Sequence, residues 1–135
     1  MSALILKKIW QDVDFFEVSC TAKTDNICIK SKTYMTDLLI DELCHYIDEF
    51  VDCSLSEFVW GTGDKGDAFT IRLHVFYKGL QKRVIIEYYT SIDDDVDSDH
   101  SCCIYIKDKE INDLIKLCNG LKRLKTKELG VQLTI

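Results

Sequence analysis

The run "SIDDDVDSDH" at residues 91–100 carries the side chains whose type and spacing most resemble a site. Five aspartates lie within it: Asp93, Asp94, Asp95, Asp97 and Asp99. The last three repeat the D-x-D-x-D opening of an EF-hand calcium loop, which also requires glycine at its sixth position and glutamate at its twelfth. His100 and Ile106 occupy those two positions. We therefore favour a negatively charged surface for a basic partner. A solvated turn is the main alternative, and weak, irregular binding of Ca²⁺ or Mg²⁺ is a lesser one.

Histidine and cysteine occur together at His100, Cys102 and Cys103. A structural zinc ion needs about four converging ligands, whereas Cys102 and Cys103 point to opposite faces if they lie in a strand. Cys44 and His45 are also adjacent in the sequence. Side chains of adjacent helical residues point about 100° apart, so these two do not form a nucleophile–base pair. We expect no metal, no cofactor and no catalytic site from these residues.

The segment "GTGDKG" at 61–66 matches the glycine spacing of a dinucleotide-binding loop. That loop works because its last glycine opens a helix, and here the sequence continues as a strand. A hairpin turn is the favoured interpretation, since tight turns select Gly and Asp.

A second acidic region covers residues 33–64, which contain eight acids and no Lys or Arg. Apolar residues spaced by three and four predict a helix over 36–53, with Thr36 as its N-cap. The opposite face of this helix is predicted to bind a partner through Asp41, Glu42, His45, Tyr46, Asp48, Glu49 and Asp52. Like charges one turn apart cost a few tenths of a kcal/mol, so stability alone does not favour this pattern.

The elements that must position these residues follow from periodicity. Strands are predicted within 3–10, 14–24 and 27–35, then the helix, then four strands joined by short turns between residues 57 and 107. A second amphipathic helix is predicted over 110–124, with Asp108 as a cap, and a last strand over 131–135. The order βββ-α-ββββ-α-β predicts an α+β fold with a mostly antiparallel sheet and two helices packed against it.

Length and composition limit the class of protein. The 135 residues predict one domain, and no apolar run is long enough for a membrane helix or a signal peptide. Seven scattered cysteines predict free thiols, so a cytoplasmic location is expected. The net charge of −6 disfavours direct binding of nucleic acid. Positive charges gather near the end of the chain instead, at Lys116, Lys122, Arg123, Lys125 and Lys127.

The layout of the chain, with "TDLLIDELCHYIDEF" and "INDLIKLCNGLKRL" as its helical landmarks, resembles bacterial immunity proteins of contact-dependent growth inhibition and related polymorphic toxin systems. The resemblance implies a stoichiometric inhibitor that occludes a basic toxin domain, often a nuclease. It carries over no contact residues. A small-molecule-binding or regulatory domain is the alternative function, and an enzyme with a dispersed Cys/His/Asp site is a less favoured one.

Overall fold

The computed structural model describes residues 2–63, 70–94, 98–126 and 128–135. Ten elements follow one another in the predicted order βββ-α-ββββ-α-β, which confirms the α+β class. They are β1 (Ala3–Gln11), β2 (Phe16–Lys23), β3 (Cys28–Met35), α1 (Asp37–Val51), β4 (Glu57–Gly61), β5 (Ile71–Lys78), β6 (Arg83–Asp94), β7 (Ser98–Lys109), α2 (Ile111–Leu124) and β8 (Gln132–Thr134).

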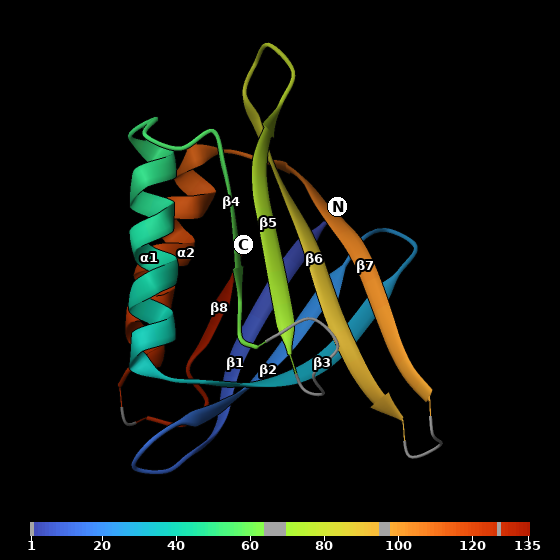
Figure 1. The fold of residues 1–135 in the computed structure, drawn as a ribbon, viewed down its shortest axis with the longest axis vertical. Coiled ribbons are helices and arrows are strands. Elements are labelled where there is room, and N and C mark those ends of the chain that lie inside the picture. Colours follow the sequence, from blue (N-terminus) through green and yellow to red (C-terminus); the bar gives the residue numbers. More distant parts are fainter. Residues whose placement is uncertain (1, 64–69, 95–97, 127) are drawn as a thin grey trace.

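The strands form two four-stranded antiparallel sheets, a division that the sequence did not specify. The first sheet has the order β3-β2-β1-β8, and the second has the order β4-β5-β6-β7. The second sheet is the predicted meander. Figure 1 shows the first sheet behind the second and the two helices side by side along one side of the molecule. Helix α1 contacts β4 and helix α2 contacts β8, so each helix borders the edge of one sheet.

The core lies between the two sheets and the helices. Alternate residues of each strand point inward, such as Leu4 and Leu6 in β1 and Ile71, Leu73 and Val75 in β5, and all are buried. The hydroxyls of Ser31 in β3 and Tyr88 in β6 lie 2.7 Å apart and join the two sheets. The inward faces of both sheets are therefore committed to packing. Their outward faces remain available to bind other molecules.

Helix α1 begins where the sequence predicts. The hydroxyl of Thr36 accepts a hydrogen bond from the Leu39 backbone N–H at 3.2 Å, which satisfies one of the unpaired donors at the helix start. Its buried face consists of Ile40, Leu43, Cys44, Ile47 and Phe50. The acidic residues consequently fall on the opposite, outward face.

Helix α2 has a different cap from the one predicted. Glu110 is the N-cap and forms a capping box with Asp113, whose carboxylate accepts from the Glu110 N–H at 2.8 Å. Asp108 instead has a left-handed φ of 60°, at an irregularity where the β6–β7 register shifts between Val84 and Ile86. The prediction of Asp108 as the cap is wrong because the strand continues through a bulge to Lys109.

Gly120 lies within α2, which continues past it to Leu124. A side chain there would meet Leu133, because a Cβ built on Gly120 lies 2.8 Å from the Leu133 Cβ. The glycine thus lets β8 approach the helix closely. Within the described residues, no helix combines the length and apolarity needed to cross a membrane.

Candidate functional site

The predicted acidic face of α1 is on the surface. Asp41, Glu42, Asp48 and Asp52 are exposed, as is His45. Three of the predicted residues are already engaged: the Lys125 ammonium lies 2.6 Å from Asp41, and His45 Nε2 lies 3.1 Å from Glu49. Within the described part of the chain, Glu42, Asp48 and Asp52 make no ion pair.

Two residues at the end of this face have defined surroundings. The Asp52 carboxylate accepts a hydrogen bond from the Ser54 N–H at 2.9 Å, and hydrogen bonding with Ser54 lowers its pKa. Asp52 therefore keeps its negative charge well below neutral pH. Tyr46 is half-buried and stacks on Phe58, with ring centroids 5.6 Å apart. The predicted anchor is thus partly fixed against β4 rather than projecting fully into solvent.

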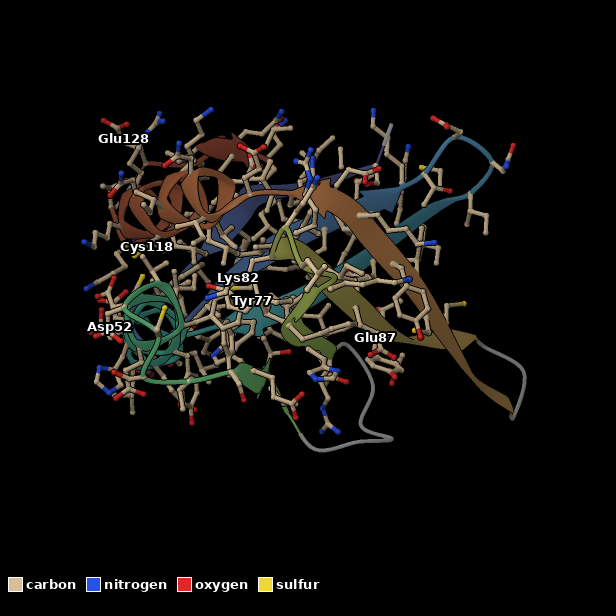
Figure 2. The ribbon with its side chains drawn as sticks, turned by 90° about the horizontal axis from the view of Figure 1, so that it is seen from above. Asp52, Tyr77, Lys82, Glu87, Cys118 and Glu128 are labelled. Atoms are coloured by element: carbon tan, nitrogen blue, oxygen red, sulfur yellow. The ribbon has the colours of Figure 1, made fainter. Side chains whose placement is uncertain are left out.

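The described aspartates of the run lie at the end of β6 and the beginning of β7. Asp93 pairs with Asp99 and Asp94 with Ser98 in the strand register, and the predicted residues Asp95 and Asp97 lie outside the described residues. Figures 1 and 2 show α1 and the adjoining ends of β6 and β7 at opposite sides of the molecule. The structure therefore does not bring the two predicted acidic regions together into one patch.

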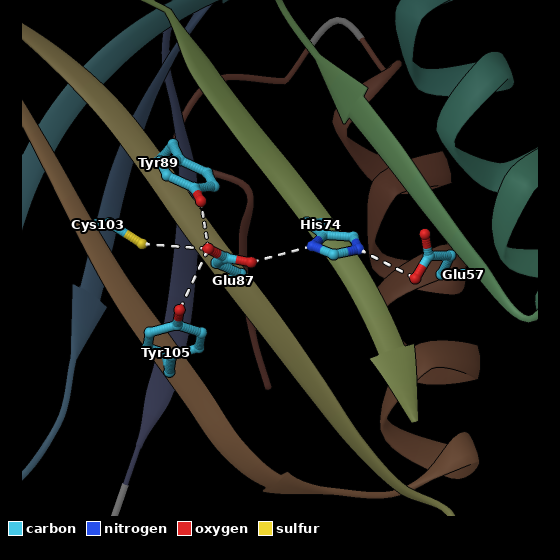
Figure 3. Close-up of polar contacts among 6 residues, drawn as sticks. All are labelled: Glu57, His74, Glu87, Tyr89, Cys103 and Tyr105. Carbon is cyan, nitrogen blue, oxygen red and sulfur yellow. Dashed lines mark hydrogen bonds and ion pairs between the residues drawn. The ribbon is translucent and has the colours of Figure 1, made fainter. Parts of the chain in front are cut away.

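A polar network that the sequence did not predict lies between them, on the outer face of β4–β7 (Figure 3). Glu87 is at its centre, with a side chain only 12% exposed. One of its oxygens lies 2.9 Å from His74 Nδ1, and the other accepts from the hydroxyls of Tyr89 and, at 3.3 Å, Tyr105. The Cys103 thiol donates to that second oxygen at 3.7 Å.

The strand register explains why these side chains meet. His74 on β5 lies directly opposite Glu87 on β6, and Glu87 lies directly opposite Tyr105 on β7. Side chains directly opposite on one face of an antiparallel pair have Cβ atoms about 5 Å apart. The outward ring of His74 also places Nε2 3.6 Å from the carboxylate of Glu57 on β4. One histidine is thus held between two carboxylates.

The network holds negative charge on Glu87. Hydrogen bonds from Tyr89 and His74 lower the pKa of Glu87 below its usual 4.5, against the opposing effect of burial. The effect on its neighbours is opposite: the hydrogen bond to Glu87 raises the pKa of Tyr89, and the charge of Glu87 raises that of Tyr105. Burial, with the nearby Glu87 charge, raises the pKa of Cys103.

These shifts decide what the network can do chemically. Cys103 stays a thiol at neutral pH, and its partner is a carboxylate rather than a histidine base, so the geometry lacks an activated nucleophile. The described residues contain no group of three or more His, Cys, Asp or Glu side chains placed to hold a metal ion. The network is suited to holding a fixed, partly buried negative charge within an aromatic surface.

Replacing Glu87 by Gln should weaken the fold at neutral pH and remove part of its acid sensitivity. Hydrogen bonds to a charged group contribute about 1.5–3 kcal/mol, so we expect the free energy of unfolding to fall by about 2 kcal/mol at pH 7. Because the pKa of Glu87 is lowered in the folded state, its contribution is present above pH 4.5 and is lost as pH falls through the folded value.

Urea unfolding at pH 7 and at successively lower pH tests this expectation. The variant should lose less stability than the original protein below about pH 4.5. Glu57→Gln is the matched control, since the Glu57 side chain is 64% exposed and its removal should change stability by less than about 0.5 kcal/mol. Parallel pH curves for Glu87→Gln and the original protein would show that Glu87 is not held as described.

Comparison with known proteins adds no relative from which to assign these surfaces. No protein-family model, curated protein or solved structure matches the chain.

Proposed function

We propose that this protein is a toxin-neutralising immunity protein that binds a basic toxin domain through the outward face of α1 and occludes that domain's working surface. The observation that carries the proposal is the set of exposed carboxylates of Glu42, Asp48 and Asp52 on one helix face, which make no ion pair with the residues that the structure describes. No Lys or Arg lies within α1 to offset them. An exposed helix that lacks such pairs gives up stability that i,i+4 ion pairs commonly provide.

The surface next to this face supports a protein partner more than a free ion. Figures 1 and 2 show α1 and the second sheet on the same side of the molecule, with α2 and the first sheet behind them. On the outer face of that sheet, Val59 of β4, Tyr89 and Tyr105 are exposed. Tyrosine is enriched among residues that dominate binding energy. An acidic helix with exposed tyrosines on the same side of the molecule fits a partner that is basic and has an apolar centre.

Inhibition of this kind needs no catalysis by the inhibitor. A basic toxin groove would meet the negative potential of α1, which speeds encounter by about 10–10³-fold and disfavours neutral or acidic partners. Once bound, a domain of this size would cover the toxin's groove and block access to it. The cytoplasm is the compartment in which such an inhibitor would act.

Capture of the partner from its native lysate, with the products of neighbouring reading frames added, tests the proposal. Tagged protein should retain a basic protein at low salt and retain less of it at about 0.5 M salt, where charges beyond a few ångströms are screened. The captured protein should lose its toxic activity when mixed in equimolar amount. Retention without inhibition would contradict the immunity function, and retention of nothing would favour the small-molecule-binding alternative.

A further inference from the structure

A row of three side chains crosses the outer face of the first sheet. Trp10 of β1 lies directly opposite Glu17 of β2, and Glu17 lies directly opposite Tyr34 of β3. The carboxylate therefore sits between two aromatic residues. Phe15, in the β1–β2 turn, contacts both rings, with centroids 5.6 Å from Trp10 and 5.3 Å from Tyr34.

A β-bulge in β1 produces this arrangement. The register with β2 shifts between Lys8 and Trp10, so that Lys8 opposes Val18 and Trp10 opposes Glu17. Lys8 points inward and is buried, and without the extra residue Trp10 would point inward as well. Bulges commonly redirect a side chain next to a functional site. Here the bulge leaves Trp10 43% exposed on the outer face.

The row forms one wall of a groove of about 550 Å³. It is lined by Trp10, Phe15, Glu17, Tyr34, Met35, Thr36, Leu39 and Thr62. Among the described residues of this lining, Glu17 is the one that carries a charge. Leu39 belongs to α1, so the groove borders the acidic helix.

The adjoining groove adds to the negative potential. It shares Phe15 and Thr36 with the first and is also lined by Asp12, Asp14 and Asp37. The two lysines among its described lining residues are engaged elsewhere: the Lys125 ammonium pairs with Asp41, and the Lys8 ammonium donates to the carbonyls of Leu124 and Thr126. Lys7, Lys30 and Lys32 share the outer sheet face but are not among the described residues that line either groove.

One wall of the adjoining groove also holds a hydrogen-bond acceptor without a donor. The Gln11 side-chain oxygen is buried and, within the described residues, makes no hydrogen bond. A buried acceptor left in this state costs about 1–3 kcal/mol. A ligand that brings N–H donors into the grooves would satisfy it.

We propose that the groove lined by Trp10, Glu17 and Tyr34 binds an arginine side chain of the partner, carried on a segment with apolar neighbours. Arginine fits all of these observations, because its flat guanidinium stacks on aromatic faces, pairs with a carboxylate and has five N–H donors. Phe15, Met35 and Leu39 offer apolar contacts to the flanking residues. The inference rests on the proposed function only for the identity of the partner.

The tripeptide acetyl-Leu-Arg-Leu-amide serves as the probe, and acrylamide quenching of tryptophan fluorescence is the measurement. Trp60, the second tryptophan, is 2% exposed, so quenching reports mainly on Trp10. The peptide should protect Trp10 in a saturable manner below about 10 mM. The citrulline analogue, which keeps the shape of arginine without its charge, should bind about tenfold more weakly.

Glu17→Gln should weaken binding of the arginine peptide about tenfold, whereas Glu128→Gln, at an exposed residue after α2, should leave it unchanged. Absence of saturable protection, or equal affinity for the citrulline peptide, would overturn the proposal. Equal affinity for methylguanidinium alone would overturn the apolar part of it and favour a small cation as the ligand. Because the toxin is absent from this titration, its failure is distinct from a failure of the capture experiment.

Discussion

Charge reversal on α1 should slow capture of the basic partner by about 10–10³-fold at low salt. The variant carries Glu42→Lys, Asp48→Lys and Asp52→Lys, which changes the charge of the helix face by six units. These three residues are exposed and make no ion pair within the described chain. Surface substitutions of this kind change stability by only about 0.5 kcal/mol each. The effect should therefore appear in the association rate and not in the fold.

The adjoining ends of β6 and β7 supply a control with the same change in charge. Asp93→Lys, Asp94→Lys and Asp99→Lys also add six units, at the opposite side of the molecule from α1 (Figure 1). Stopped-flow association at several salt concentrations compares the two variants. We expect the helix variant to lose most of its salt dependence and the hairpin variant to keep it. The reverse result would place the interface at the aspartate run, and equal rates for all three proteins would remove both from it.

The fold class was predictable because local patterns carry it. The alternation of Ile71, Leu73 and Val75 and the three- and four-residue spacing of Ile40, Leu43 and Ile47 each indicate one element without knowledge of the rest. The division into two sheets was not predictable, since β1 pairs with β8 at the far end of the chain. Pairing between distant strands produces no pattern within a short stretch of sequence. The order of the elements therefore did not indicate which strands belong to each sheet.

The site residues show the same limit. The sequence indicated the acidic face of α1, because helical spacing alone gathers Glu42, Asp48 and Asp52 on one side. It did not indicate Glu87 with His74 or Trp10 with Glu17, since each depends on strand register. A shift of one residue moves a side chain to the other face, and the bulge in β1 makes such a shift. The only local signal is the alternation that places Glu87 and Tyr89 on the same strand face.

Lys8→Met should lower the free energy of unfolding by about 3 kcal/mol, the largest effect on stability that we expect from a single side chain. Lys8 is 1% exposed and lies in β1, yet its ammonium donates to the carbonyl of Leu124 at 3.0 Å and to that of Thr126. These carbonyls lie at the end of α2, where the helix dipole is negative and backbone acceptors lack helical partners. The ammonium also lies 4.7 Å from the centre of the Phe16 ring.

Two effects oppose each other in this substitution, and their magnitudes decide its sign. Burial lowers the pKa of Lys8, with Asp37 acting against that shift, so removal of the ammonium relieves a desolvation penalty. Methionine fills similar space but leaves the Leu124 and Thr126 carbonyls without their donor, at about 1–3 kcal/mol each. We expect the loss of these hydrogen bonds to outweigh the relief of desolvation, because two acceptors lose one shared cation.

Urea unfolding of Lys8→Met beside Lys7→Met separates these effects. Lys7 is the exposed neighbour on the same strand, so its substitution removes an equal charge without touching α2 and should change stability by less than about 0.5 kcal/mol. A lowered lysine pKa also predicts that the original protein gains stability relative to Lys8→Met as pH rises toward 10.5, since the unfolded chain then binds more protons at this residue. A Lys8→Met protein as stable as the original would show that the desolvation cost of the ammonium cancels the benefit of its hydrogen bonds. The carbonyls at the end of α2 would then not require a cation.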